Sequence, residues 1–82
     1  MTIRRMRRLL DARGVPRESY RIFRIGVNPP EDVAVFHVGF MEYQLYAIER
    51  GKKHLEARYR SKNDACHHFV TWLTNEPVVE TR

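Results

Sequence analysis

The chain has 82 residues, of which 43% are hydrophobic, and its net charge is +5. This composition predicts a single globular domain, and no apolar run reaches the roughly 18 residues that a membrane-spanning helix needs. The lone cysteine, Cys66, excludes an internal disulfide bond and a cysteine-based zinc site within one chain. We expect one domain over residues 1–82, with its core in about residues 2–75 and a frayed tail over residues 76–82. A free thiol and the absence of a secretory signal predict a cytoplasmic protein.

The positive charge is concentrated at the N-terminal end. Residues 1–24 hold eight arginines against two acidic residues, a net charge of +6, whereas residues 25–82 hold seven basic and eight acidic residues, a net charge of −1. Such an asymmetry favours an anionic partner, which can be a nucleic acid, a lipid surface or an acidic protein. An ordinary solvated helix face in an arginine-rich proteome explains it equally well.

The first predicted element is an amphipathic helix over Thr2–Arg13. At about 100° per residue, its apolar residues fall on one arc of a helical wheel: Ile3, Met6, Leu9 and Leu10. Four arginines fall on the opposite arc: Arg4, Arg5, Arg7 and Arg8. Gly14 and Pro16 predict the end of this helix, because glycine adopts the left-handed cap and proline cannot continue the hydrogen-bond ladder.

Four strands are predicted to follow. The residue pattern places them over Tyr20–Ile25, Asp32–Val38, Tyr43–Arg50 and Lys53–Arg60. The segment "GVNPPED" after the first strand is a predicted loop, because its prolines cannot donate to a ladder. Gly39 marks the next turn, and Gly51 supplies the positive φ that a tight hairpin needs.

The last predicted element is a helix from Ser61 to about Asn75. The Ser61 hydroxyl can cap its first turn, Asp64 completes a capping-box pattern, and Pro77 follows its end. The order α-β-β-β-β-α with short turns predicts a two-layer α+β domain: an antiparallel four-stranded β-meander flanked by an N-terminal and a C-terminal helix. If both helices cover one sheet face, the other face exposes an aromatic, half-apolar patch of the kind that forms interfaces. One helix on each face is the alternative.

The run Cys66-His67-His68 raises the question of a metal or catalytic site. An apolar stripe at helical spacing contains Cys66, Phe69, Val70 and Leu73, which predicts a core position for the cysteine. The two histidines point about 100° apart, with His68 toward solvent, so they cannot converge on one metal ion. No nucleotide-binding, P-loop or nucleophile-elbow motif is present. We therefore expect no catalytic residue, no metal, no cofactor and no enzymatic activity.

Two sets of spaced residues resemble a known family. The first is Gly14-Val15-Pro16, Tyr20 and Glu31-Asp32, and the second is Tyr43, Tyr46, Glu49-Arg50-Gly51, Ser61, Asp64, Ala65 and Cys66. Over roughly residues 14–73 the chain resembles the small immunity proteins encoded beside contact-dependent growth-inhibition toxins and related bacterial polymorphic toxins. In that family a tyrosine-rich strand enters a turn of the "ERG" type, and "S-x-x-E-A-C" begins a helix. The chain departs from the family in Asp64, where glutamate is commoner, and in its arginine-rich first helix, since many inhibitors of nuclease toxins are acidic.

The resemblance implies an immunity protein that binds the C-terminal toxin domain of its cognate effector one-to-one. It would block the active site or another surface that the toxin needs, and by family analogy the toxin is a nuclease. Such an inhibitor presents aromatic and arginine anchors on a preorganised surface. The first candidate surface joins the first helix to the tight hairpin: Arg4, Arg5, Arg8, Glu49, Arg50 and Lys52. The second candidate is the sheet face around His37, Tyr43 and Tyr46.

The alternative function is a small basic nucleic-acid-binding domain. In it, the arginines of the first helix neutralise phosphates and tyrosines stack on bases, although no recognised binding motif is present. A third interpretation makes the N-terminal helix a membrane-surface anchor. The helix lacks a bulky aromatic anchor, and its apolar stripe is more simply the face that packs on the sheet, so we expect no membrane partner.

Overall fold

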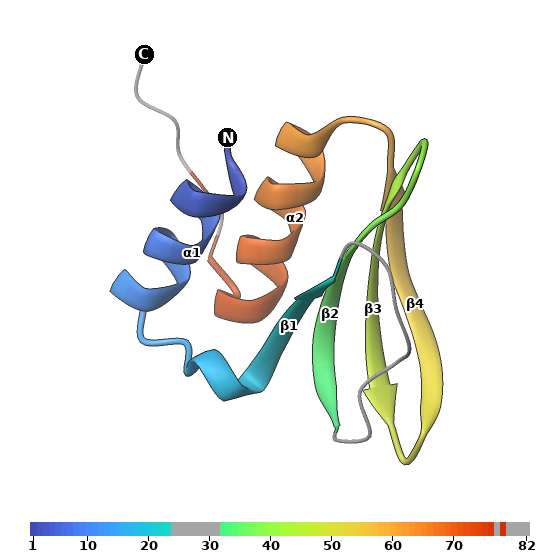
Figure 1. Ribbon diagram of the computed structural model, residues 1–82. Coiled ribbons are helices and arrows are strands. Elements are labelled where there is room, and N and C mark those ends of the chain that lie inside the picture. The colour runs from blue at the N-terminus through green and yellow to red at the C-terminus, as the bar shows by residue number, and fades with distance from the viewer. Residues whose placement is uncertain (24–31, 77, 79–82) are drawn as a thin grey trace.

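The computed structural model describes residues 1–23, 32–76 and 78, and Figure 1 shows its architecture. The elements in chain order are α1 (Ile3–Ala12), the short 3₁₀ helix η1 (Arg17–Ser19), β1 (Tyr20–Phe23), β2 (Val33–Val38), β3 (Tyr43–Glu49), β4 (Lys52–Tyr59) and α2 (Lys62–Thr74). The predicted order of a helix, four strands and a helix is confirmed. The last two residues predicted for the first strand, most of the loop "GVNPPED" and most of the tail lie outside the described residues.

The sheet is mixed, so the predicted antiparallel meander is wrong at its first strand. The strand order is β1-β2-β3-β4, with β1 parallel to β2 and the two later pairs antiparallel. Short turns reverse the chain after β2 and after β3. The connection from β1 to β2 is longer, with nine residues (24–32), and parallel strands cannot be joined by a tight hairpin turn.

Both helices pack on one face of the sheet, with α1 beside α2 (Figure 1). The core between the two layers consists of Met6, Leu10, Tyr20, Phe36, Leu45, Ala65, Cys66, Phe69 and Val70. Phe69 joins the layers, because its ring meets Phe36 and Tyr20 edge-on, with centroids 5.4 and 6.0 Å away. Within the residues described, neither helix is long and apolar enough to cross a membrane.

A second, smaller cluster lies on the sheet face opposite the helices. The alternation of side chains along β2 and β3 places Val33, Val35, Tyr46 and Ile48 there, and Phe23 packs against them. All four residues of β2 and β3 are buried, and Tyr46 keeps only 3% of its exposure. The expected open aromatic patch is therefore wrong, and this face carries a second small core.

Local sequence signals locate the helix starts and the tight hairpin. Ser61 caps α2 as predicted, and Thr2 caps α1; each hydroxyl accepts a hydrogen bond from the amide three residues later. Arg50 and Gly51 have φ values of 52° and 77°. Two consecutive positive φ angles are those of a two-residue type I′ turn, so the predicted hairpin at Gly51 is confirmed.

Candidate interaction surface

Four arginines of α1 form an exposed basic face. This arginine face consists of Arg4, Arg5, Arg7 and Arg8, and all four are exposed. None of their guanidinium groups makes a hydrogen bond or ion pair with another described residue. Other arginines of this end are engaged: Arg13 donates to Thr74, and Arg17 pairs with Asp11 at 2.9 Å. Arg7 interacts electrostatically with the Asp11 carboxylate, and the rest of this positive charge can attract an anionic partner.

A shallow groove of about 500 Å³ runs between α1 and the edge of the sheet at β1 and β2. It is lined by Ile3, Arg4, Arg7, Ile22 and Val38. Three of these side chains are apolar and two belong to the arginine face. The groove can therefore hold an apolar group that has anionic neighbours.

The structure does not join the arginine face to the β3–β4 hairpin. Glu49, Arg50 and Lys52 are exposed at the hairpin tip, and Figure 1 shows this tip at the end of the sheet away from α1. The Arg50 amide donates to the Asp32 carboxylate at 2.9 Å, which ties the tip to the start of β2. The first predicted surface is therefore two separate regions.

The second predicted surface is divided as well. His37 and Tyr46 lie on the face opposite the helices, with ring centroids 6.4 Å apart. Tyr43 lies on the helix side, where its ring packs 5.9 Å from that of Phe36. Burial raises the pKa of the Tyr46 phenol, and the Lys53 ammonium sits 4.4 Å above its ring. Tyr46 is therefore part of the second core and not an open anchor.

In the Cys-His-His run, the cysteine and the second histidine lie in different environments. Cys66 is fully buried, as its place on the apolar stripe predicts, and burial raises the pKa of its thiol. Among the described residues, no three His, Cys, Asp or Glu side chains gather as metal ligands. The prediction that His68 lies on the solvent side with Asp64, Thr71 and Asn75 is confirmed only in part: these residues line one surface hollow, but the His68 side chain is 29% exposed and both ring nitrogens are hydrogen-bonded.

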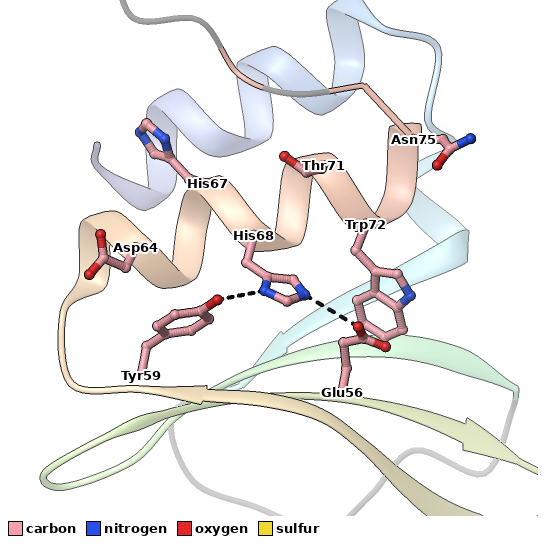
Figure 2. Close-up of a pocket in the computed structure, with 8 residues that line it drawn as sticks. All are labelled: Glu56, Tyr59, Asp64, His67, His68, Thr71, Trp72 and Asn75. Atoms are coloured by element: carbon pink, nitrogen blue, oxygen red, sulfur yellow. Dashed lines mark hydrogen bonds and ion pairs between the residues drawn. The ribbon is translucent and has the colours of Figure 1, made fainter.

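His68 lies at the centre of a hollow between α2 and β4, shown in Figure 2. This α2–β4 hollow has a volume of about 560 Å³ and is lined by Glu56, Tyr59, Asp64, His67, His68, Thr71, Trp72 and Asn75. A carboxylate can only accept, so the tautomer that fits this geometry donates from Nε2 to Glu56 Oε1, 3.3 Å away. Nδ1 then accepts from the Tyr59 hydroxyl at 2.6 Å. These hydrogen bonds join α2 to the edge strand β4.

An irregularity in β4 directs Glu56 toward His68. Leu45 pairs with Ala57, and the next residue, Tyr46, pairs with residue 55, so Glu56 is the extra residue of a bulge. Strict alternation would place Glu56 on the face opposite Ala57, away from the helices. Sequence periodicity therefore could not predict the partner of His68.

The β2–β3 turn carries the most exposed large apolar side chains of the described residues. Phe40 is 99% exposed and Met41 74% exposed, and together they form an apolar tip. The Gly39 amide donates to the Glu42 carbonyl at 2.8 Å, and a Cβ at Gly39 would lie 2.8 Å from that same oxygen, so this turn depends on glycine. In the sequence, Gly39 predicted only a turn here. The missed signal is two large apolar residues in a turn, where polar residues are usual.

Comparisons with known proteins give no match. A scan against protein-family models finds none that fits the chain, and searches of curated proteins and of solved structures find no similar protein. The geometry of the candidate surfaces is therefore the basis for a functional proposal. They are the arginine face, the apolar tip and the α2–β4 hollow.

Proposed function

We propose that the chain is a cytoplasmic immunity protein that binds the toxin domain of a cognate effector one-to-one. It neutralises the toxin by covering the active site or another surface that the toxin needs. The observation that carries the proposal is the apolar tip, because Phe40 keeps 99% of its exposure on a folded domain. Single exposed apolar residues are common, but two large neighbours on a turn form a projection that can enter a pocket of a partner.

The geometry of the apolar tip suits an inhibitor. The Gly39–Glu42 hydrogen bond closes the turn, and the strands on both sides are paired up to Val38 and Tyr43. A tip held in this way loses little conformational freedom on binding, which favours a slow release rate. The resemblance of residues 14–73 to immunity proteins supports a toxin as the partner.

Co-purification tests the proposal. The tagged protein is co-expressed with the product of the gene immediately upstream, and the complex is titrated by calorimetry at near-physiological salt. We expect a one-to-one complex with a Kd of about 1 nM or tighter. Phe40→Ala should weaken it by at least about 30-fold, because an aromatic anchor leaves its pocket. Failure of the wild-type chain to bind this product would refute the proposal.

Nucleic-acid binding is a second candidate function, favoured by the arginine face. Its guanidinium groups are exposed and make no hydrogen bond or ion pair with another described residue. Each phosphate contact adds about −0.9 to the slope of log K against log salt on duplex DNA. Anisotropy titrations over a range of salt concentrations measure this slope. When Arg4 and Arg8 are both changed to Gln, its magnitude should decrease by about 2. Unchanged binding by that variant would reject the second candidate.

A further inference from the structure

We infer that the α2–β4 hollow binds a cationic side chain, an arginine, of the protein partner. The inference rests on the proposed function, which supplies the partner. It adds the chemistry of the group that enters this hollow and the residues that receive it, Glu56 and Trp72.

The hollow is acidic although the chain is basic. The side chains of Glu56 and Asp64 line it, and no lysine or arginine among the described residues does. Glu56 uses Oε1 for His68, which leaves Oε2 for a ligand. In the part of the chain described, the Asp64 carboxylate makes no hydrogen bond or ion pair, so the return bond to the Ser61 amide that a capping box would contain is not formed. A cation is therefore the complementary ligand.

Trp72 makes a planar cation the better ligand. Trp72 and Glu56 both line the hollow, and Figure 2 shows Asp64 toward its other end. A guanidinium can lie flat on an indole and direct two N–H groups at a carboxylate, whereas an ammonium is a compact, strongly hydrated charge. We therefore expect arginine to bind more tightly than lysine.

His68 holds the acceptor in position before a ligand arrives. Its Nε2–H donates to Glu56, and its other nitrogen accepts from Tyr59, so the ring is fixed from both sides. A carboxylate fixed in this way loses less side-chain entropy on pairing than a free one. His68 is thus a positioning residue for the Glu56 carboxylate.

One partner can reach the hollow and the apolar tip together. Tyr59 lines the hollow and pairs with Tyr43, the first residue after the turn that carries Phe40. Neighbouring strands lie only about 4.8 Å apart. Figure 1 also shows the β2–β3 turn and the start of α2 at the same end of the molecule. A partner that receives Phe40 can therefore place an arginine in the hollow.

The hollow is tested first without the toxin. N-acetyl-L-arginine methylamide is titrated into isotope-labelled protein, and the indole N–H resonance is followed; the chain has one tryptophan, so the signal is that of Trp72. We expect saturable shifts, weaker binding of the lysine analogue and none of the glutamate analogue. Glu56→Gln keeps an accepting oxygen for His68 but removes the charge, and should weaken arginine binding about tenfold. An indole signal that does not move, or that moves equally in Glu56→Gln, overturns the inference.

The complex with the upstream product is tested second. Glu56→Gln should bind it about tenfold more weakly. The control, Glu18→Gln, makes the same charge change on an exposed residue of η1 and should bind like the wild type. Equal binding by wild type and Glu56→Gln would overturn the inference and leave the proposed function standing. If the wild type does not bind, the proposed function is wrong, and the arginine titration alone decides whether the hollow takes a cation.

Discussion

The two flanks of the helix layer carry charge in opposite ways. On α1, the arginine face presents four like charges without hydrogen-bond or ion-pair partners among the described residues. Between α2 and β4, two carboxylates surround a histidine whose ring nitrogens are both hydrogen-bonded. The first flank acts through its field, which salt screens over about 8 Å, and the second acts through the fixed positions of a few atoms. A net charge of +5 therefore does not state which ligand each surface takes.

The largest predicted effect is a loss of folding stability that affects both flanks, because α1 and α2 pack on the same core. Phe69→Ala should lower the free energy of unfolding by about 3–5 kcal/mol, since the ring is fully buried and packs edge-on against Phe36 and Tyr20. Urea denaturation followed by far-UV circular dichroism measures it. The control is Phe40→Ala, the same change at the apolar tip, which should stay within about 0.5 kcal/mol of the wild type. Equal losses in the two variants would contradict the assigned core.

Removing the helix caps should destabilise the protein more at α2 than at α1. Ser61→Ala should cost about 1 kcal/mol of global stability, because α2 contributes four buried residues to the core. Thr2→Ala removes the equivalent hydrogen bond from α1, which buries only Met6 and Leu10. Because the first turn of α1 can open without unfolding of the whole domain, this variant should lose about half as much global stability as Ser61→Ala. Hydrogen exchange resolved by residue measures both. A larger global loss from Thr2→Ala would reverse this ranking of the helices.

A smaller effect tests whether the hydrogen bonds of the α2–β4 hollow stabilise the fold. Tyr59→Phe removes the hydroxyl that donates to His68 and should cost about 0.5–1 kcal/mol, because the histidine is partly exposed and water can replace the donor. Tyr43→Phe is the matched control, since its hydroxyl makes no hydrogen bond with a described residue. Chemical denaturation compares the two. The interpretation fails if Tyr43→Phe is as destabilising as Tyr59→Phe.

Features that depend on neighbours in the chain were predictable, and features that depend on tertiary placement were not. The Ser61 cap and the Gly51 hairpin involve residues within a few positions of each other, so their signals are local. The direction of β1 relative to β2 is a feature of the tertiary structure, which no periodicity reports. The same holds for the partner of His68, because the bulge at Glu56 overrides alternation.

For the candidate surfaces, too, local features were predictable and tertiary placement was not. The arginine face was predictable, because a helical wheel places Arg4 and Arg8 directly. Its combination with the hairpin at Lys52 was wrong, because sequence distance does not state which ends of the sheet lie near α1. The exposure of Phe40 also needed the structure, since a phenylalanine in an α+β domain is more often buried.

The smallest predicted effect concerns the carboxylate of Asp11, in the C-terminal turn of α1. The hydrogen bond from Arg17 to Asp11 lowers the pKa of that carboxyl below its ordinary value of 3.8. A carboxyl whose pKa is lower in the folded state stabilises the fold above its unfolded-state pKa, and this contribution is lost as the pH falls through the folded-state pKa. Arg17→Gln should raise the pKa of Asp11 toward the ordinary value, which carbon-detected NMR titration measures, whereas Arg5→Gln should leave it unchanged. Both partners are exposed, so unfolding curves at neutral pH should not distinguish the variants. An unmoved Asp11 titration in Arg17→Gln would show that the pair does not persist in solution, and the whole α1 flank would then act only through its summed charge.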